Sequence, residues 1–139
     1  MSLTLAMVKP DAVASGKTGK IIAHLEGGGF RVVALRMTRL SRRQAEAFYE
    51  VHRARPFFES LVSFMCSGPV VPMILQSEGA VQRLRDTIGA TDPAEAADET
   101  VRALFAESKE RNAIHASDSD QNAHLETAFF FSASERLSL

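Results

Sequence analysis

The stretch "LTLAMVKP" at residues 3–10 decides the fold. Its apolar side chains run almost without interruption, which is typical of a short strand buried in a protein interior. Pro10 ends this strand, because proline has no backbone N–H to donate to a sheet. We therefore predict that a buried strand over residues 3–9 begins the domain.

Helical and strand-like patterns alternate after this first strand. Ile21, Ile22 and Leu25 share one helical face, and the glycines at 27–29 end that helix. Ser41 is of a residue type that caps helices, and apolar residues at helical spacing follow it. The predicted strands are residues 3–9, 31–40, 69–76 and 126–132, and the predicted helices lie within 18–29, after Ser41, within 55–65 and within 80–89.

This order of elements predicts an α+β fold. It matches the ferredoxin-like split βαβ arrangement, a four-stranded antiparallel sheet with helices packed on one face. Pro72, within the third predicted strand, indicates an edge position or an irregularity there. No repeat, linker or low-complexity tract divides the sequence, so we expect residues 1–139 to form a single domain.

The composition argues against several classes of protein. Of the 139 residues, 45% are hydrophobic and the formal net charge is -1, which disfavours a protein that coats nucleic acid. Cys66 is the only cysteine, which excludes an intramolecular disulfide and a cysteine zinc site. The N-terminus lacks a signal-peptide pattern, and no apolar run approaches the roughly 18 residues that cross a bilayer. We expect a cytoplasmic protein that does not bind membranes.

Two segments begin like ligand-binding loops but lack required residues. The run "GKT" at 16–18 is like the end of a phosphate-binding P-loop, but Asp11 stands where that loop needs its first glycine. The run "DSDQN" at 118–122 starts like a calcium loop, but Ala123 and Phe129 occupy the glycine and glutamate positions. We interpret the residues around 117–119 as a helix cap instead.

His115, in "NAIHASDSD" at 112–120, is a candidate for several roles. It could be a packed core residue, a metal ligand or a nucleophile. Zinc binding is disfavoured because the four histidines lack the usual ligand spacing. A serine–histidine hydrolase is disfavoured because Ser117 is not part of a G-x-S-x-G motif. His115 alone does not decide between packing and nucleophilic chemistry.

Several motifs taken together resemble a known family. In chain order they are "MVKPDAV" (7–13), "RPFF" (55–58), "SGPVV" (67–71), "GATDPAEA" (89–96) and "NAIHASDS" (112–119). A single one of these would be weak evidence, but the set in this order closely resembles the nucleoside diphosphate kinases, in particular the short bacterial type. The resemblance runs from about Leu3 to Phe131.

The resemblance implies a ping-pong phosphoryl transfer through His115. A nucleoside triphosphate would give its γ-phosphoryl group to this imidazole, and a nucleoside diphosphate would then take it. Neutral imidazole suits the role because it is a good nucleophile near neutral pH. The exchange is nearly isoenergetic, so such an enzyme needs positioning and charge neutralisation more than driving force.

The resemblance also implies which residues bind phosphate. Lys9, Arg85 and Arg102 match the family's phosphate-binding cations. Arginine can bind phosphate oxygens through two N–H groups, and lysine acts as a point charge. Thr91 is expected to donate its hydroxyl to phosphate, and Asn112 to contact the sugar hydroxyl or the phosphates.

Base binding and support of the imidazole are implied in the same way. Phe57 matches the surface on which the base stacks, with Leu61 one turn further along its helix. Because every base has a π-face, stacking is consistent with a broad substrate range. Tyr49, Ser117 and Glu126 match residues around the imidazole, and Glu126 would orient the ring and stabilise its protonated form.

Further expectations concern cofactor and partners. Mg²⁺ is expected on the nucleotide phosphates, with water filling most of its shell and no dedicated protein ligands. The resemblance implies a homo-oligomer, a tetramer or hexamer built from dimers, and nucleoside tri- and diphosphates as partners. The alternative is a ferredoxin-like module without catalysis, either a regulatory relative or a nucleic-acid binder that stacks bases on the aromatic residues at 129–131.

Three positions depart from the family pattern. Ala116 replaces a glycine, Leu104 replaces an aspartate, and Lys109 replaces an aliphatic residue that covers the second face of the base. The lysine stem can still pack on the ring, but less completely than an aliphatic side chain.

We predict that Lys109→Val binds nucleotides more tightly than the parent protein, because an aliphatic side chain covers the base without a charge to hydrate. Isothermal calorimetry with one nucleotide compares the two proteins directly. Equal or weaker affinity of the variant would contradict the expectation.

Overall fold

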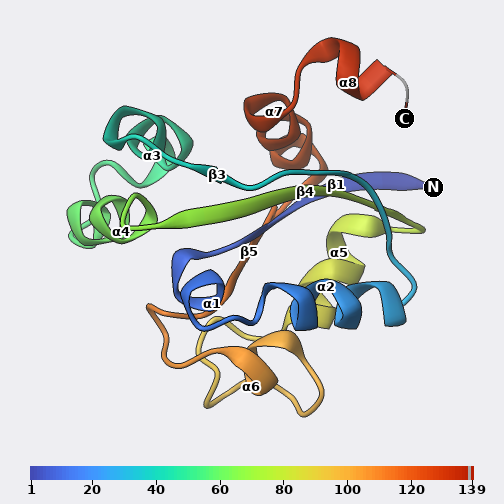
Figure 1. Cartoon of the computed structure of the whole chain (residues 1–139), viewed down its shortest axis with the longest axis horizontal. Helices are drawn as coiled ribbons and strands as arrows, with labels where there is room; N and C mark the ends of the chain where they lie inside the picture. The colour runs from blue at the N-terminus through green and yellow to red at the C-terminus, as the bar shows by residue number, and fades with distance from the viewer. Residues whose placement is uncertain (138) are drawn as a thin grey trace.

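In the computed structural model, which describes residues 1–137 and 139, an antiparallel sheet lies between two groups of helices (Figure 1). The strands are β1 (Ser2–Val8), β2 (Arg31–Leu35), β3 (Thr38–Arg39), β4 (Pro69–Ser77) and β5 (Ile114–Ala116). The helices are α1 (Pro10–Ala14), α2 (Thr18–Gly27), α3 (Arg42–Phe48), the 3-10 turn η1 (Glu50–His52), α4 (Phe58–Met65), α5 (Ala80–Ile88), α6 (Val101–Phe105), α7 (Asp120–Phe130) and α8 (Ala133–Leu137).

The strand order confirms the predicted ferredoxin-like arrangement. The sheet runs β2-β4-β1-β5, β3 also pairs with β4, and the pairs are antiparallel. Counted in chain order, the four principal strands therefore lie in the order second, third, first, fourth. β1 is central and pairs along its whole length with β4, from Ser2 opposite Ser77 to Val8 opposite Val71.

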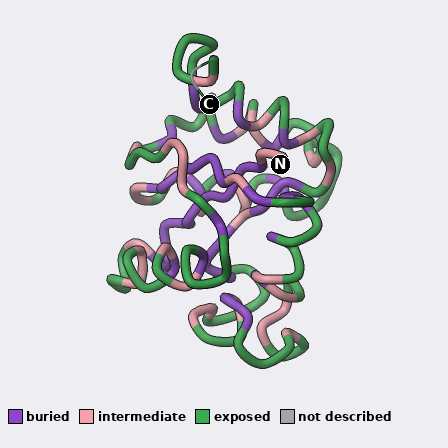
Figure 2. Tube along the Cα trace, turned by 90° about the vertical axis from the view of Figure 1, so that its right-hand side faces the viewer, coloured by how far each residue is buried: buried purple, intermediate pink, exposed green. Residues whose placement is uncertain are grey.

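Helices cover both faces of the sheet, not one face as predicted. Successive residues of β1 point to opposite faces, and those from Thr4 to Val8 are all fully buried. Leu5 and Met7 pack with α3, α4 and α7, whereas Ala6 and Val8 pack with α2 and α5. Figure 2 shows the buried residues concentrated along the central strands. The nearly continuous apolar character of β1 requires cover on both sides, because an exposed face would place its large side chains in water.

The proline in β4 marks an irregularity, not an edge, since β4 lies between β2 and β1. The Pro72 carbonyl accepts a hydrogen bond from the Arg36 N–H at 3.2 Å. In an antiparallel pair, the N–H and C=O positions of one residue face the same neighbour. The missing donor of Pro72 therefore faces the break between β2 and β3, where the predicted strand over 31–40 is interrupted.

The predicted last strand over 126–132 is wrong, because this segment belongs mostly to helix α7. The Ser119 side chain accepts a hydrogen bond from the Asn122 N–H at 3.0 Å and caps the helix, as the sequence indicated. The aromatic run favoured a strand, but the cap and the helix-forming residues that follow it favour a helix. Of the phenylalanines at 129–131, two are buried and Phe129 is partly exposed, so they do not form an aromatic platform on a strand.

Other local predictions have clear outcomes. Ser41 caps α3 through a reciprocal pair of hydrogen bonds with Gln44.

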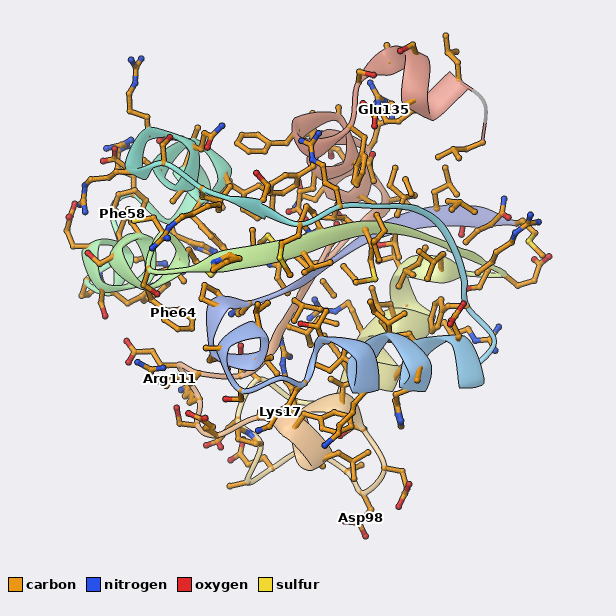
Figure 3. All side chains as sticks on the ribbon, viewed as in Figure 1. Lys17, Phe58, Phe64, Asp98, Arg111 and Glu135 are labelled. Carbon is orange, nitrogen blue, oxygen red and sulfur yellow. The ribbon has the colours of Figure 1, made fainter. Side chains whose placement is uncertain are left out.

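Lys17, labelled in Figure 3, does not belong to a phosphate loop. Its ammonium group donates to the Phe105 carbonyl at 3.0 Å and connects the start of α2 to the end of α6. None of the helices in the described part of the chain is both long and apolar enough to cross a membrane.

Candidate functional site

A cleft of about 840 Å³ brings together residues that are far apart in the sequence. Helices α3 to α7, strand β5 and the segments before them contribute to its walls. Every candidate residue except Ser117 lines it. The candidate residues that line the cleft are Lys9, Tyr49, Phe57, Leu61, Arg85, Thr91, Arg102, Asn112, His115 and Glu126.

His115 lies on β5 and faces this cleft. Its strand neighbours Ile114 and Ala116 are buried, whereas the alternation of the strand turns His115 toward the opening, where 19% of its side chain is exposed. Nε2 lies 2.8 Å from Oε1 of Glu126 on α7. The Ser117 hydroxyl donates to the same oxygen at 2.7 Å. Glu126 therefore fixes the ring through Nε2. Nδ1 is the ring nitrogen that this contact does not use.

Aromatic rings pack against the imidazole edge to face. The ring centroids of Phe48 and Tyr49 lie 5.1 Å and 6.0 Å from that of His115. Tyr49 is buried, and its hydroxyl has no hydrogen-bond partner among the described residues. Burial, followed by the charge of Glu126, raises the pKa of Tyr49, so this side chain stays neutral. These rings restrict the imidazole to a narrow range of orientations.

Three cations face the cleft without a carboxylate partner. Within the described residues, Lys9, Arg85 and Arg102 form no ion pair. Burial and then the charge of Arg102 lower the pKa of Lys9 to about 8, although the charge of Asp11 opposes the change. Burial and then the charge of Arg85 lower the pKa of Arg102 to about 10. Such mutual repulsion makes this end of the cleft a favourable position for an anion.

The Arg102 guanidinium group also holds the backbone around the site. It donates to the carbonyls of Gly89 at 3.0 Å, Ile114 at 2.8 Å and Asn112 at 3.4 Å. A guanidinium group has five N–H donors, so two remain for a ligand. Arg102 thus connects the loop after α5 to the segment that carries His115.

Asn112 is a buried bridge at the same end of the cleft. Its Oδ1 accepts from the Lys9 ammonium at 2.8 Å, and its Nδ2 donates to the Thr91 carbonyl at 3.2 Å. Asn112 is 3% exposed, so most of its amide serves these protein contacts. Thr91 is exposed at the rim.

The other end of the cleft has one apolar wall and one polar wall. Phe57 is 47% exposed and Leu61, on α4, is half-buried. The opposite wall includes Lys109 and its neighbours. A hydrogen bond of 2.9 Å from the Ser60 hydroxyl to Glu110 connects the two walls.

The structure adds residues that the sequence analysis did not single out. His52 lines the cleft and packs between Tyr49 and Phe57, with ring centroids 6.3 Å and 5.4 Å apart. Phe48, the last residue of α3, lines the cleft as well. Asp118 lines the cleft near Arg85. The hydrogen bond that it accepts from the Asn122 amide is the largest cause that lowers the pKa of Asp118. The sequence signal that could have identified Phe48 and His52 is that both lie close to Tyr49 along the chain.

Comparison with protein families gives one match over nearly the whole chain. The family model described as "Nucleoside diphosphate kinase" matches residues 2–136. The chain is 55% identical to the nucleoside diphosphate kinase of Wolinella succinogenes over 135 residues, which cover 97% of this chain and 98% of that protein. It is 53% identical to the Campylobacter jejuni enzyme, with the same coverage of both chains.

Solved structures show the same relationship. The nucleoside diphosphate kinase of Aquifex aeolicus superposes with a TM-score of 0.94 at 48% identity, covering 96% of this chain and 97% of that one. The enzyme of Halobacterium salinarum, solved in complex with CDP, superposes with a TM-score of 0.92 at 37% identity, covering 96% and 90%.

The contact between Glu126 and His115 predicts the tautomer of the neutral imidazole. A carboxylate can only accept, so the ring proton is expected on Nε2; in Glu126→Gln the amide can donate, and the proportion of the Nδ1–H form should rise. Nitrogen-15 chemical shifts of the imidazole report the tautomer. Glu110→Gln, which changes an exposed carboxylate at the rim, is the matched control. Identical imidazole spectra for Glu126→Gln and the parent would contradict the assignment.

Proposed function

We propose, for a chain that belongs to the nucleoside diphosphate kinase family, that His115 carries the phosphoryl group between nucleotides. The protein is a phosphotransferase that moves the γ-phosphoryl group of a nucleoside triphosphate to a nucleoside diphosphate. The observation that carries the proposal is the pairing of Nε2 with Glu126 at 2.8 Å in a cleft with three cations that form no ion pair within the described part of the chain.

Nδ1 of His115 is the nucleophile in this proposal. With its proton on Nε2 and donated to Glu126, the ring keeps a lone pair on Nδ1. Nδ1 attacks the γ-phosphorus, a P–N bond forms, and the P–O bond to the leaving diphosphate breaks. A terminal phosphate oxygen of a second nucleoside diphosphate then attacks the same phosphorus, and the P–N bond breaks. Glu126 offsets the positive charge that the ring gains in the phosphorylated state.

Lys9, Arg85 and Arg102 bind the phosphate oxygens. Their charges stabilise the transferring group, whose negative charge is spread over its oxygens. Lys9 is held by Asn112, and Arg102 by backbone carbonyls, so both are positioned before a nucleotide arrives. This preorganisation reduces the rearrangement needed during transfer. Thr91 adds a hydroxyl donor at the rim.

The base lies against Phe57 and Leu61 at the other end of the cleft. The exposed ring of Phe57 offers a stacking face, and Lys109 lies on the opposite wall. Asn112 contacts the sugar or the phosphates from its position beside Lys9 at the phosphate end. Tyr49 and Ser117 support the imidazole, Tyr49 by packing and Ser117 through Glu126.

Mg²⁺ is proposed as part of the substrate, carried on the nucleotide phosphates. The side chains fit such an ion: the carboxylates near the cations are Asp118, beside Arg85, and Glu126, which binds His115, and within the described residues no cluster of three or more possible metal ligands occurs, whereas a protein-held ion needs several. When bound, the ion neutralises phosphate charge and helps to orient the phosphates.

Domain organisation, assembly and location are also proposals. A single domain over residues 1–139 is supported by the family match and by two core clusters that share the same sheet. A homo-oligomer, a tetramer or hexamer built from dimers, and a cytoplasmic location are inferred from the family. Nucleoside tri- and diphosphates are the proposed partners.

The first test is incubation with γ-labelled nucleoside triphosphate followed by intact-mass analysis. We expect an acid-labile phosphoryl adduct on the parent protein and none on His115→Ala, because His115 is the imidazole that Glu126 orients within the cleft that holds the phosphate-binding cations. His24→Ala, which changes a histidine outside the cleft, is the control and should retain the adduct. Absence of the adduct from the parent would refute the proposed function.

The second test uses the lowered pKa of Lys9. The lysine binds phosphate only while protonated, and its pKa in the free protein is about 8. We therefore expect kcat/KM to fall as the pH rises through this value, since kcat/KM reports groups of the free enzyme. In Lys9→Arg the side chain stays charged, so any remaining activity should lack this fall. Adenosine nucleotides suit the assay because their base does not ionise in this range; a flat profile for the parent would contradict the prediction.

A further inference from the structure

Ala113 has a backbone conformation that its side chain disfavours. Its φ angle is 74°, in the left-handed region that residues with a Cβ rarely occupy. The Ile114 N–H donates to the Asn112 carbonyl at 2.9 Å, which closes a tight turn centred on Ala113. A turn of this kind is strained, so surrounding contacts must maintain it.

Both peptide groups of Ala113 are bound to the junction between β1 and α1. Its N–H donates to Oδ2 of Asp11 at 3.0 Å, and its carbonyl accepts from the Lys9 N–H at 2.8 Å. These partners are about a hundred residues away in the sequence. Ala113 is fully buried, so no water can replace either contact.

The Asp11 carboxylate is in an unusual position for a charged group. It is 5% exposed, and Oδ1 has no hydrogen-bond partner among the described residues. Burying a carboxylate is costly when it is incompletely paired. Its place in the first turn of α1 is favourable electrostatically, but the directed hydrogen bond goes to Ala113.

The turn at Ala113 sets the positions of residues on either side of it. Asn112 precedes it and binds the Lys9 ammonium, and His115 follows two residues later. If Ala113 relaxed to an ordinary conformation, the direction of the chain between Asn112 and His115 would change. The imidazole would then be displaced from the phosphate-binding cations.

We propose that Asp11 is a positioning residue, whose buried carboxylate holds Ala113 in the left-handed conformation and thereby places His115 opposite Lys9. This inference rests on the proposed phosphoryl transfer through His115. It adds a residue that does not touch the substrate and whose effect passes through one backbone amide.

The test is a double-mutant cycle on the first-order rate of His115 phosphorylation, with nucleotide affinity measured in parallel. Asp11→Ala should slow phosphorylation by about ten- to a hundredfold, because displacement by about 1 Å has effects of this size. Nucleotide affinity should change much less, because the base-stacking wall on α4 is untouched. Thr4→Val, which alters another buried polar side chain, on β1, is the control and should leave the rate unchanged.

The second arm of the cycle is Ala113→Gly. Glycine adopts a positive φ without steric cost, so the rate should depend less on Asp11 in this background. An equal effect of Asp11→Ala in both backgrounds would overturn the proposal. So would a phosphorylation rate in Asp11→Ala equal to that of the parent; the adduct on the parent would then still support the proposed function. Absence of the adduct from the parent protein would refute both the proposed function and the positioning role of Asp11.

The folding of the double variants and one further variant, Asp11→Asn, cover failure to fold and a purely structural role. If Asp11→Ala does not fold, Ala113→Gly or, as the control, Thr4→Val is added to it. Recovery of folding with Ala113→Gly and not with Thr4→Val supports the proposal. Failure of both added substitutions to restore folding overturns the proposal. Asp11→Asn keeps an acceptor oxygen and should restore most of the rate at neutral pH; a loss as large as that of Asp11→Ala would count against the hydrogen bond.

Asp11→Asn should also move the alkaline fall of kcat/KM to lower pH. The charged groups that act on the Lys9 ammonium are Arg102 on α6, which lowers its pKa, and Asp11 on α1, which raises it. The Asn112 amide also faces it. Without the Asp11 charge, the pKa of Lys9 falls further. An unmoved profile would overturn the placement of the carboxylate beside Lys9.

Discussion

Around the cleft, the Lys9, Arg85 and Arg102 charges lie close enough that Arg102 lowers the pKa of Lys9, and Arg85 that of Arg102. No carboxylate is paired with them among the described residues. The folded chain therefore contains electrostatic repulsion that a polyphosphate removes on binding. Ligand binding to the native state alone stabilises it, so the same charges that bind the nucleotide couple its concentration to the stability of the fold.

The sheet is what keeps these charges together. Lys9 directly follows the central strand β1, and His115 lies on β5, the strand paired beside it. Arg85 comes from α5, which packs against β1, β4 and β5, and Arg102 from α6, which packs against α5. Each group thus lies on, or directly follows, an element that packs against the sheet or against a helix that covers it. Positioning for phosphoryl transfer therefore follows from the packing of these elements.

The sequence was sufficient where a pattern is local or where several motifs occur together. The burial of most of β1, the caps at Ser41 and Ser119 and many of the residues that line the cleft could be predicted, whereas Phe48 and His52 of the cleft were missed. The segment 126–132 was wrongly predicted to be a strand. The strand propensity of its aromatic residues is outweighed by the helix cap and the tertiary setting of α7. The left-handed Ala113 was not predictable, since its conformation depends on Asp11, a contact that spans most of the chain.

The hydrogen bond between Ser60 and Glu110 joins the two walls of the cleft at the surface, where it is exposed to solvent. A solvent-exposed bond of this kind contributes on the order of 1 kcal/mol or less, so thermal fluctuations break it frequently. In a ping-pong cycle the first nucleotide must depart before the second can enter through the same opening. A weak connection between the walls therefore favours rapid exchange of products for substrates, while the buried contact between Lys9 and Asn112 holds the phosphate end.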